Sequence, residues 1–422
     1  MTTTATTSDF SQDMKVLGLI STGHFLSHFY YLVLPPLFVF IKADLGLNFT
    51  QLGIMMSLLY AVAAVAQIPV GFLVDRVGAR VVLTGGLFIM STAFALIGLV
   101  PAAAQALMGL GITSDPTYPM ILAVLALGGI GHSVFHPADY AILSSSINPM
   151  RMGRAFSIHT FCGHMGSAVA PASILFLAAL TDWKLALVMS GLFGIVVMFA
   201  MTSQWNSLHD DALPKKKDKA EATDEAENDT KDGLALLLSR PMLLFFLFFA
   251  ALAMMASGVQ SFLVVGLVGV GAASLDGAGY ALTAFLFASA AGILIGGEIA
   301  DRTARHDLVA ITAFVITGII MVSVTLFEPG LILVCSIMVI AGLSQGIIRP
   351  ARDMMVRTAS PKGSTGKVFG FVSAGIAAGG AVAPAIFGAI MDAGRPAWIF
   401  YVMAVFMVIA MFSVAVPKPS HQ

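Results

Sequence analysis

The chain has 422 residues, of which 58% are hydrophobic and only 11% are charged, and its mean hydropathy is +0.91. A soluble domain carries about a quarter charged residues, so this chain has too little polar surface for an aqueous environment. Its net charge of −1 also lacks the basic excess expected of a nucleic-acid-binding protein. We therefore expect the lipid bilayer to surround most of the chain and expect no nucleic-acid partner.

Apolar segments long enough to cross a bilayer, each of about 20 residues, follow one another along the chain. They begin near residues 15, 50, 80, 119, 154 and 184 and, after a polar interruption, near 240, 278, 307, 330, 365 and 396. The first run, residues 16–41, is too long for the core of a signal peptide, so it is interpreted as a retained helix. Backbone groups in lipid must be satisfied within each segment, which predicts an all-α membrane protein with 12 transmembrane helices.

The polar interruption at residues 205–236 divides the chain into an N-terminal bundle, residues 1–204, and a C-terminal bundle, residues 237–422. It mixes both charge signs and has almost no large apolar side chain, which predicts a flexible cytoplasmic linker, with contact to lipid headgroups as the alternative. Placing both termini in the cytoplasm puts nearly all loop arginines and lysines inside; only Lys42, Lys184 and Arg395 lie outside. The positive-inside rule favours this topology, in the cell inner membrane.

The two halves repeat each other at a constant offset of 213 residues. The matched pairs are His136-Pro137 with Arg349-Pro350, Gly153 with Gly366, and Ala170-Pro171 with Ala383-Pro384. A looser match relates Asp75-Arg76, within residues 71–80, to Asp301-Arg302, within residues 296–305, at an offset of 226. Two pseudo-symmetric six-helix bundles that rock around a central site are typical of secondary transporters.

The stretch GFLVDRVGAR, residues 71–80, resembles the loop motif between helices two and three of the major facilitator superfamily. This resemblance covers essentially the whole chain. Residues 133–141, 153–171 and 285–302 are similar to the fosmidomycin-resistance branch, whose members are proton-driven exporters of drugs and anions. The resemblance implies that helices one, four, seven and ten surround the central cavity, with helix five contributing. It also implies that the loop pairs Asp75-Arg76 and Asp301-Arg302 latch the cytoplasmic side.

Histidines with helical spacing are the first candidate site. His24 and His28 share one face of the first segment with Tyr31, and His132 and His136 repeat that spacing on the fourth. Because histidine titrates near neutral pH, these residues are candidates for substrate binding, and His136 also for proton coupling. Helix packing is the alternative, and it is the preferred role for His132 and for His159 and His164 on the fifth segment. We expect no metal or cofactor, because no carboxylate or cysteine completes either histidine pair.

Cationic side chains distinguish the second half. Arg349 and Arg352 on the tenth segment are not typical of the fosmidomycin-resistance branch. A guanidinium group binds carboxylate or phosphonate oxygens in a bidentate manner, which makes Arg349 a candidate for anion binding. The alternative is an Arg349–Asp353 pair within one helix that only neutralises charge. Gln260 and Gln345 are further candidates for substrate binding.

The repeat suggests a gate, because Asp139 corresponds to Arg352 at the offset of 213. We hypothesise that the two side chains pair in the outward-facing state and close the cytoplasmic side. The alternative is that each pairs within its own half. Asp353 belongs to the same candidate gating group.

The sequence therefore predicts a monomeric, proton-coupled transporter of a small organic anion that favours export. Uptake of a small carboxylate by proton symport is the first alternative, and a non-transporting membrane sensor is the second. The chain contains no GxxxxGK[ST] phosphate-binding motif, so an ion gradient is the expected energy source. No nucleophile–base constellation stands out, and we do not expect an enzyme.

Overall fold

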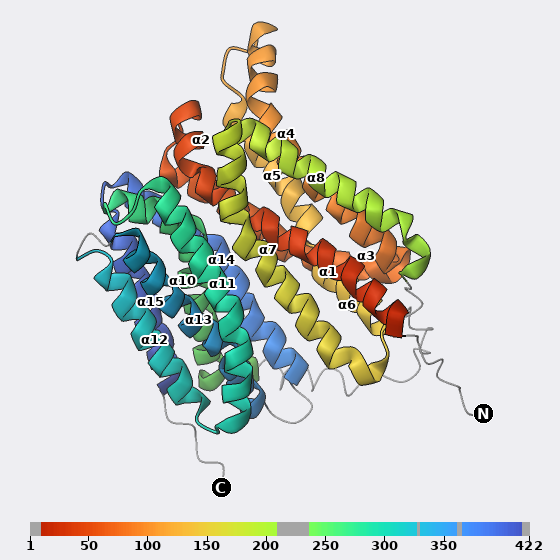
Figure 1. Cartoon of the computed structure of the whole chain (residues 1–422), viewed down its shortest axis with the longest axis vertical. Coiled ribbons are helices and arrows are strands. Elements are labelled where there is room, and N and C mark those ends of the chain that lie inside the picture. The colour runs from red at the N-terminus through yellow and green to blue at the C-terminus, as the bar shows by residue number, and fades with distance from the viewer. Residues whose placement is uncertain (1–9, 209–235, 327–329, 361–364, 416–422) are drawn as a thin grey trace. The chain divides into compact units, whose positions relative to one another are not determined.

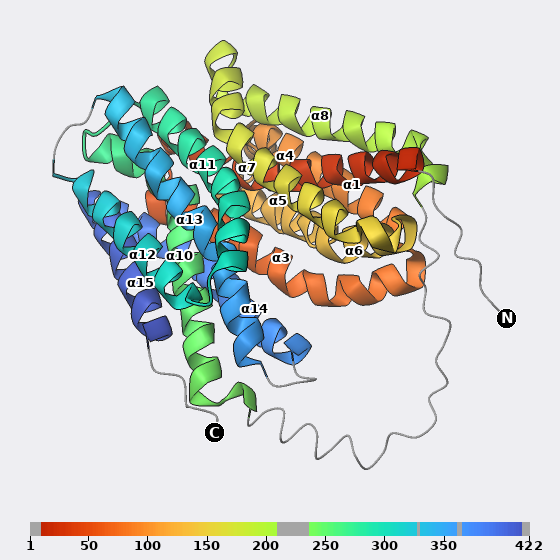
Figure 2. The same ribbon diagram turned by 60° about the horizontal axis from the view of Figure 1, so that its bottom comes forward.

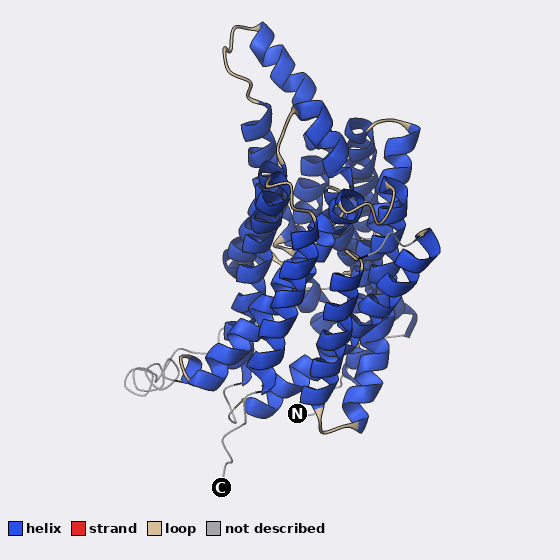
Figure 3. Cartoon of the chain, turned by 90° about the vertical axis from the view of Figure 1, so that its left-hand side faces the viewer, coloured by secondary structure: helices blue, strands red, loops and turns tan. Residues whose placement is uncertain are grey.

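The computed structural model describes residues 10–208, 236–326, 330–360 and 365–415, and within these ranges all regular structure is helical (Figures 1 and 3). The helices of the first half are α1 (Phe10–Tyr31), α2 (Phe38–Leu45), α3 (Phe49–Val77), α4 (Ala79–Gly109), α5 (Thr117–His132), α6 (Phe135–Ser146), α7 (Met152–Leu180) and α8 (Trp183–Ser203). Those of the second half are α10 (Arg240–Gly269), α11 (Leu275–Arg302), α12 (His306–Ser323), α13 (Leu331–Ala359), α14 (Thr365–Asp392) and α15 (Ala397–Ala415). Three short 3₁₀ turns, η1 (Pro35–Leu37), η2 (Pro149–Arg151) and η3 (Trp205–Ser207), complete the elements.

The predicted helical membrane fold is confirmed. Among the described residues, 11 helical spans are long and apolar enough to cross a membrane, and Ala397–Ser413 forms a shorter apolar helix that completes the second set of six. The largest error in the predicted starts is at α1, which begins at Phe10 rather than near residue 15. The first turn of α1 is polar, so hydropathy does not predict it. Asp13 in this turn is buried and forms an ion pair with Arg151.

Two of the spans in the first half are broken helices. The first span runs from Phe10 to Leu45, and its helix is interrupted where Pro35 and Pro36 enter the η1 turn. The fourth span is interrupted at residues 133–134, which leaves Pro137 in the first turn of α6, where a missing N–H costs little. Its counterpart Pro350 lies inside the continuous helix α13. The repeated proline therefore accompanies a break in only one of the two halves.

The described residues form two compact units. The first contains residues 10–40 and 58–208, and the second contains residues 41–57 and 236–415. The segment 41–57 groups with the second unit because Asp392, at the end of α14, accepts hydrogen bonds from the backbone N–H groups of Phe49 and Thr50 at 2.8 and 2.7 Å. The division into bundles at residues 1–204 and 237–422 stays a prediction, and the compact units differ from it by placing residues 41–57 in the second unit. Most of the predicted linker lies outside the described residues.

The repeat is visible inside the units as a close approach of two helices. A Cβ atom at Gly166 of α7 would lie 2.0 Å from the backbone oxygen of Phe25 on α1, and one at Gly379 of α14 would lie 2.4 Å from that of Ala250 on α10. Only glycine permits such contact between helix backbones. In the first unit, α1 and α7 consequently lie side by side, as do α4 and α8 (Figure 2).

A buried ion pair ties the start of α1 to the turn before α7. Both Nε and Nη2 of Arg151 reach Oδ2 of Asp13, at 2.7 and 2.5 Å, and Asp13 is almost completely buried. We expect Arg151→Ala to lower the free energy of unfolding by about 1.5–3 kcal/mol, because a buried carboxylate loses its charged donor. Thermal unfolding in detergent measures this. Arg154→Ala, which removes an exposed arginine three residues away, is the control and should unfold like the native chain.

Candidate functional site

Six of the nine histidines of the chain gather in the first unit. The ring of His24 lies at the centre of this cluster, with centroid distances of 4.7 Å to His28, 5.4 Å to His136 and 4.0 Å to His159. The ring of His28 in turn lies 6.4 Å from His132 and 6.0 Å from His164. The residues come from α1, α5, α6 and α7. The two histidine pairs singled out from the sequence thus share one cluster, and α7 adds two more rings.

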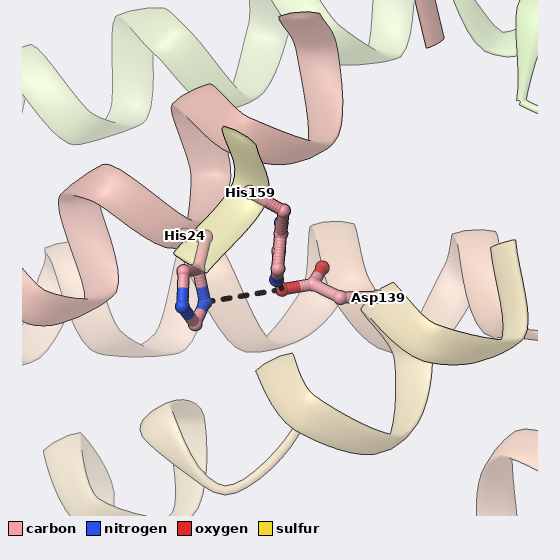
Figure 4. A group of neighbouring side chains, drawn as sticks. All are labelled: His24, Asp139 and His159. Carbon is pink, nitrogen blue, oxygen red and sulfur yellow. Dashed lines mark ion pairs between the residues drawn. The ribbon is translucent and has the colours of Figure 1, made fainter. Parts of the chain in front are cut away.

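The deepest part of the cluster is a group of three residues that we call the His–Asp–His triad: His24, Asp139 and His159. Figure 4 shows Asp139 facing both imidazoles. Its Oδ2 lies 3.3 Å from Nδ1 of His24 and 3.4 Å from Nε2 of His159. The three side chains are 5%, 0% and 1% exposed, in the order His24, Asp139, His159. Three separate helices, α1, α6 and α7, therefore each contribute one donor atom to a buried site.

The buried carboxylate of Asp139 requires a compensating positive charge. Within the described residues, neither carboxylate oxygen of Asp139 and neither ring nitrogen of His159 has a hydrogen bond of good geometry. A buried, ionised carboxylate without hydrogen bonds is strongly unfavourable unless a proton or a cation neutralises it. The imidazoles at 3.3 and 3.4 Å can hold such a proton. The site is therefore suited to taking up and releasing positive charge.

The backbone of α7 lies directly against the His24 ring at Gly163. A Cβ atom at Gly163 would lie 2.5 Å from Cδ2 and 2.6 Å from Nε2 of His24, and 3.0 Å from Cδ2 of His28. The absence of a side chain at this position lets both imidazoles pack against the helix. Gly163 is therefore part of the site through the space that it leaves for the two rings.

Aromatic and hydroxyl groups surround the outer part of the cluster. Tyr31 packs on His132 with a centroid distance of 3.7 Å and contacts Tyr60 of α3 at 4.9 Å. The hydroxyl of Ser167 lies 3.4 Å from Nδ1 of His28. Tyr31, His28 and His132 were predicted as site residues. Tyr60 and Ser167 were not, since single polar residues in apolar segments give no signal of which face they occupy.

Arg352 of α13 has partners within the second unit. The Nε of Arg352 donates to Asp353 at 2.8 Å, and its guanidinium group lies 4.6 Å from the ring centroid of buried Phe249 on α10. Arg349 lies one turn before Asp353 on the same helix, half-buried. Asp139 and Arg352 therefore each have a partner in their own unit, and their pairing in a gate stays a prediction.

The pseudo-symmetry relates the triad to this arginine. Phe25 on α1 and Ala250 on α10 make equivalent contacts, which relates these two helices by an offset of 225 residues. The helices α6 and α13, like α7 and α14, are related by the offset of 213. With these offsets His24 corresponds to Phe249 and Asp139 corresponds to Arg352. A carboxylate–imidazole contact in the first unit is thus a cation–π contact in the second. The same position of the repeat carries opposite charge in the two halves.

Other predicted residues lie apart from these groups. The amide of Gln345 is buried and donates to Thr317 of α12 at 3.2 Å, so it bonds within its own unit. Gln260 is half-buried on α10. The loop residues Asp75, Arg76, Asp301 and Arg302 are exposed at the ends of α3 and α11. Arg302 pairs with Glu298 one turn earlier.

The metal prediction needs a correction in its premise. From the sequence, no carboxylate was expected to complete a histidine pair. The structure places Asp139 between His24 and His159, with all three donor atoms within 4.8 Å of one another. The two histidines come from different helices, so a search for i,i+4 pairs could not find this combination.

Comparison with known proteins identifies the fold family. The family model of the Major Facilitator Superfamily matches residues 20–272 and 253–422. The chain belongs to this superfamily. It is therefore a multi-pass membrane transporter rather than an enzyme, as the sequence predicted.

Individual members of the superfamily show how far the likeness extends. The chain is 26% identical to the fosmidomycin resistance protein of Escherichia coli over 99% of its own length and 96% of that protein. It is 26% identical to a probable L-galactonate transporter of E. coli over 37% of the chain and 31% of that protein. The fold matches a bacterial homologue of the lysosomal transporter Spinster, with a TM-score of 0.71, 16% identity and 96% of each chain covered. It also matches the nucleoside transporter NupG, with a TM-score of 0.73, 14% identity and 94% and 98% covered.

Proposed function

We propose that this superfamily member is a proton-coupled exporter of a small organic anion. The observation that carries the proposal is the His–Asp–His triad. It is a buried carboxylate between two imidazoles inside a transmembrane bundle. Intramembrane ionisable groups of this kind are typical of proton relays and ion pathways. His28, His132, His136 and Tyr31 extend the cluster and are the proposed binding groups of the first half.

The anionic substrate is inferred from the second unit. Arg349 and Arg352 lie in a transmembrane helix that carries one acidic residue, Asp353. An arginine at membrane depth is costly and usually faces a pathway for an anion. Full-length similarity to a protein named for fosmidomycin resistance supports export. We further propose a monomer in the cell inner membrane with both termini in the cytoplasm, as the distribution of lysine and arginine favours.

Uptake of a small carboxylate by proton symport is the second candidate. It is supported by the partial similarity to a probable L-galactonate transporter. Direction separates the two candidates, because export raises the tolerance of cells to a toxic substrate, whereas uptake lowers it. Growth of E. coli without its own fosmidomycin resistance protein, with and without this chain, distinguishes these outcomes.

The coupling is tested with purified protein in liposomes under an imposed pH gradient. The substrate panel is fosmidomycin, L-galactonate and simple carboxylates, with a neutral sugar as the control. We expect flux of at least one anion that reverses when the gradient is reversed. Flux that ignores the gradient would contradict proton coupling, and flux of the neutral sugar alone would contradict anion selectivity.

Arg349 provides a specific test of anion binding. Arg349→Gln should raise KM for the transported anion about 10–100-fold, because a charge-assisted hydrogen bond contributes about 1.5–3 kcal/mol. Arg349→Lys keeps the charge and should recover part of this loss. Initial rates in the same liposomes measure both variants. An unchanged KM in Arg349→Gln would assign this residue to helix packing.

A further inference from the structure

The His–Asp–His triad has the composition of a transition-metal site. Two imidazoles and one carboxylate are a ligand set that zinc and other first-row divalent cations use in proteins. Each member comes from a different helix, and all three side chains are at least 95% buried. Binding of an ion at these three residues does not depend on proton coupling.

The distances between the donor atoms fit one ion. A tetrahedral Zn²⁺ with bonds of about 2.0–2.1 Å holds neighbouring ligand atoms about 3.3 Å apart. In the triad, Oδ2 of Asp139 lies 3.3 Å from Nδ1 of His24 and 3.4 Å from Nε2 of His159. The rings of His24 and His159 are stacked at a centroid distance of 4.0 Å, and all three donor atoms lie within 4.8 Å of one another.

The contacts are better suited to a cation than to hydrogen bonds. The separations are at the long end for charge-assisted hydrogen bonds, which are usually about 2.7–2.9 Å. Both imidazoles face the same carboxylate oxygen, and neither contact has hydrogen-bond geometry. Convergence of three donor atoms on one point is what metal coordination requires.

We propose that His24, Asp139 and His159 bind a first-row transition-metal cation of the Zn²⁺ class. Three protein ligands leave a fourth position for a water molecule or an anionic oxygen, as in zinc sites that are not closed by protein. A divalent ion would neutralise the buried carboxylate, and an anionic oxygen at the fourth position would balance the positive charge that remains. Gly163 leaves the space that the His24 ring occupies, since a Cβ atom there would lie 2.5 Å from Cδ2 of His24.

The test is Zn²⁺ binding to the purified full chain, produced without a histidine tag and measured by equilibrium dialysis and by calorimetry. We expect one ion per chain and a Kd raised at least about 100-fold in His24→Gln, His159→Gln and Asp139→Asn. His306→Gln, in the second unit, is the matched control and should bind like the native chain. Size-exclusion profiles check that each variant is folded.

A second measurement needs only the native chain and the control, so it does not depend on whether the ligand variants fold. Co²⁺ in place of Zn²⁺ reports a tetrahedral nitrogen–oxygen site through its visible absorption spectrum, which should appear in the native chain and in His306→Gln. Absence of stoichiometric Zn²⁺ binding and of the spectrum in the native chain would overturn the proposal. Equal binding in Asp139→Asn would also overturn it. Failure of this test leaves proton-driven flux intact, whereas failure of proton coupling would leave Zn²⁺ binding intact.

Discussion

Asp139→Asn should reduce proton-driven transport to the level of liposomes without protein. Asparagine cannot take up a proton, so the triad loses the group that connects substrate movement to the gradient. Exchange of internal for external substrate needs no net proton movement and should persist. Asparagine has nearly the same shape as aspartate, so lost packing would not explain a loss of driven transport. Uptake and exchange of labelled anion in the same liposomes give the two rates.

The control for this variant is Asp115→Asn, in the loop before α5, where the carboxylate accepts two hydrogen bonds from Thr117. It should transport like the native chain. Loss of exchange together with driven transport in Asp139→Asn would show that the residue is needed for binding or folding. Full driven transport in this variant would place the coupling group elsewhere.

The fold was predictable because lipid imposes strong constraints on sequence. Each span needs a long apolar run and internal hydrogen bonds, and both leave a clear pattern. The starts of the spans were placed accurately wherever the polar boundary coincides with the helix end. Hydropathy does not predict polar helix ends such as the start of α1. There Asp13 pairs with Arg151, which is 138 residues away in the sequence.

The site was predictable only where its members share a helix. His24 with His28 and His132 with His136 follow from a spacing of four residues. The contact of Asp139 with His159 requires knowledge of how α6 and α7 are rotated, and sequence spacing carries no such information. This is why His159 was attributed to packing and why a metal site was not expected. The repeat did single out Asp139, because its counterpart at the offset of 213 is Arg352, a residue of opposite charge.

Gly163→Ala should disable transport while leaving the fold intact. Its methyl group would lie 2.5 Å from the His24 ring, so the imidazole must leave its place beside Asp139. Crowding of this kind costs about 1–3 kcal/mol, but alanine also recovers about 1 kcal/mol of helix propensity over glycine. The melting temperature should consequently change by a few degrees at most. We expect the driven flux to fall at least about tenfold.

Two other glycines separate this effect from helix packing. At Gly166 the methyl group would meet the backbone oxygen of Phe25 at 2.0 Å, and a backbone cannot rotate away as a side chain can. Gly166→Ala should therefore lower the melting temperature as well as the flux. At Gly380 nothing lies within 4 Å of the added atom, so Gly380→Ala should preserve both. A Gly163→Ala chain that transports normally would show that the His24 ring can move without consequence, and the triad would then lose its role in coupling.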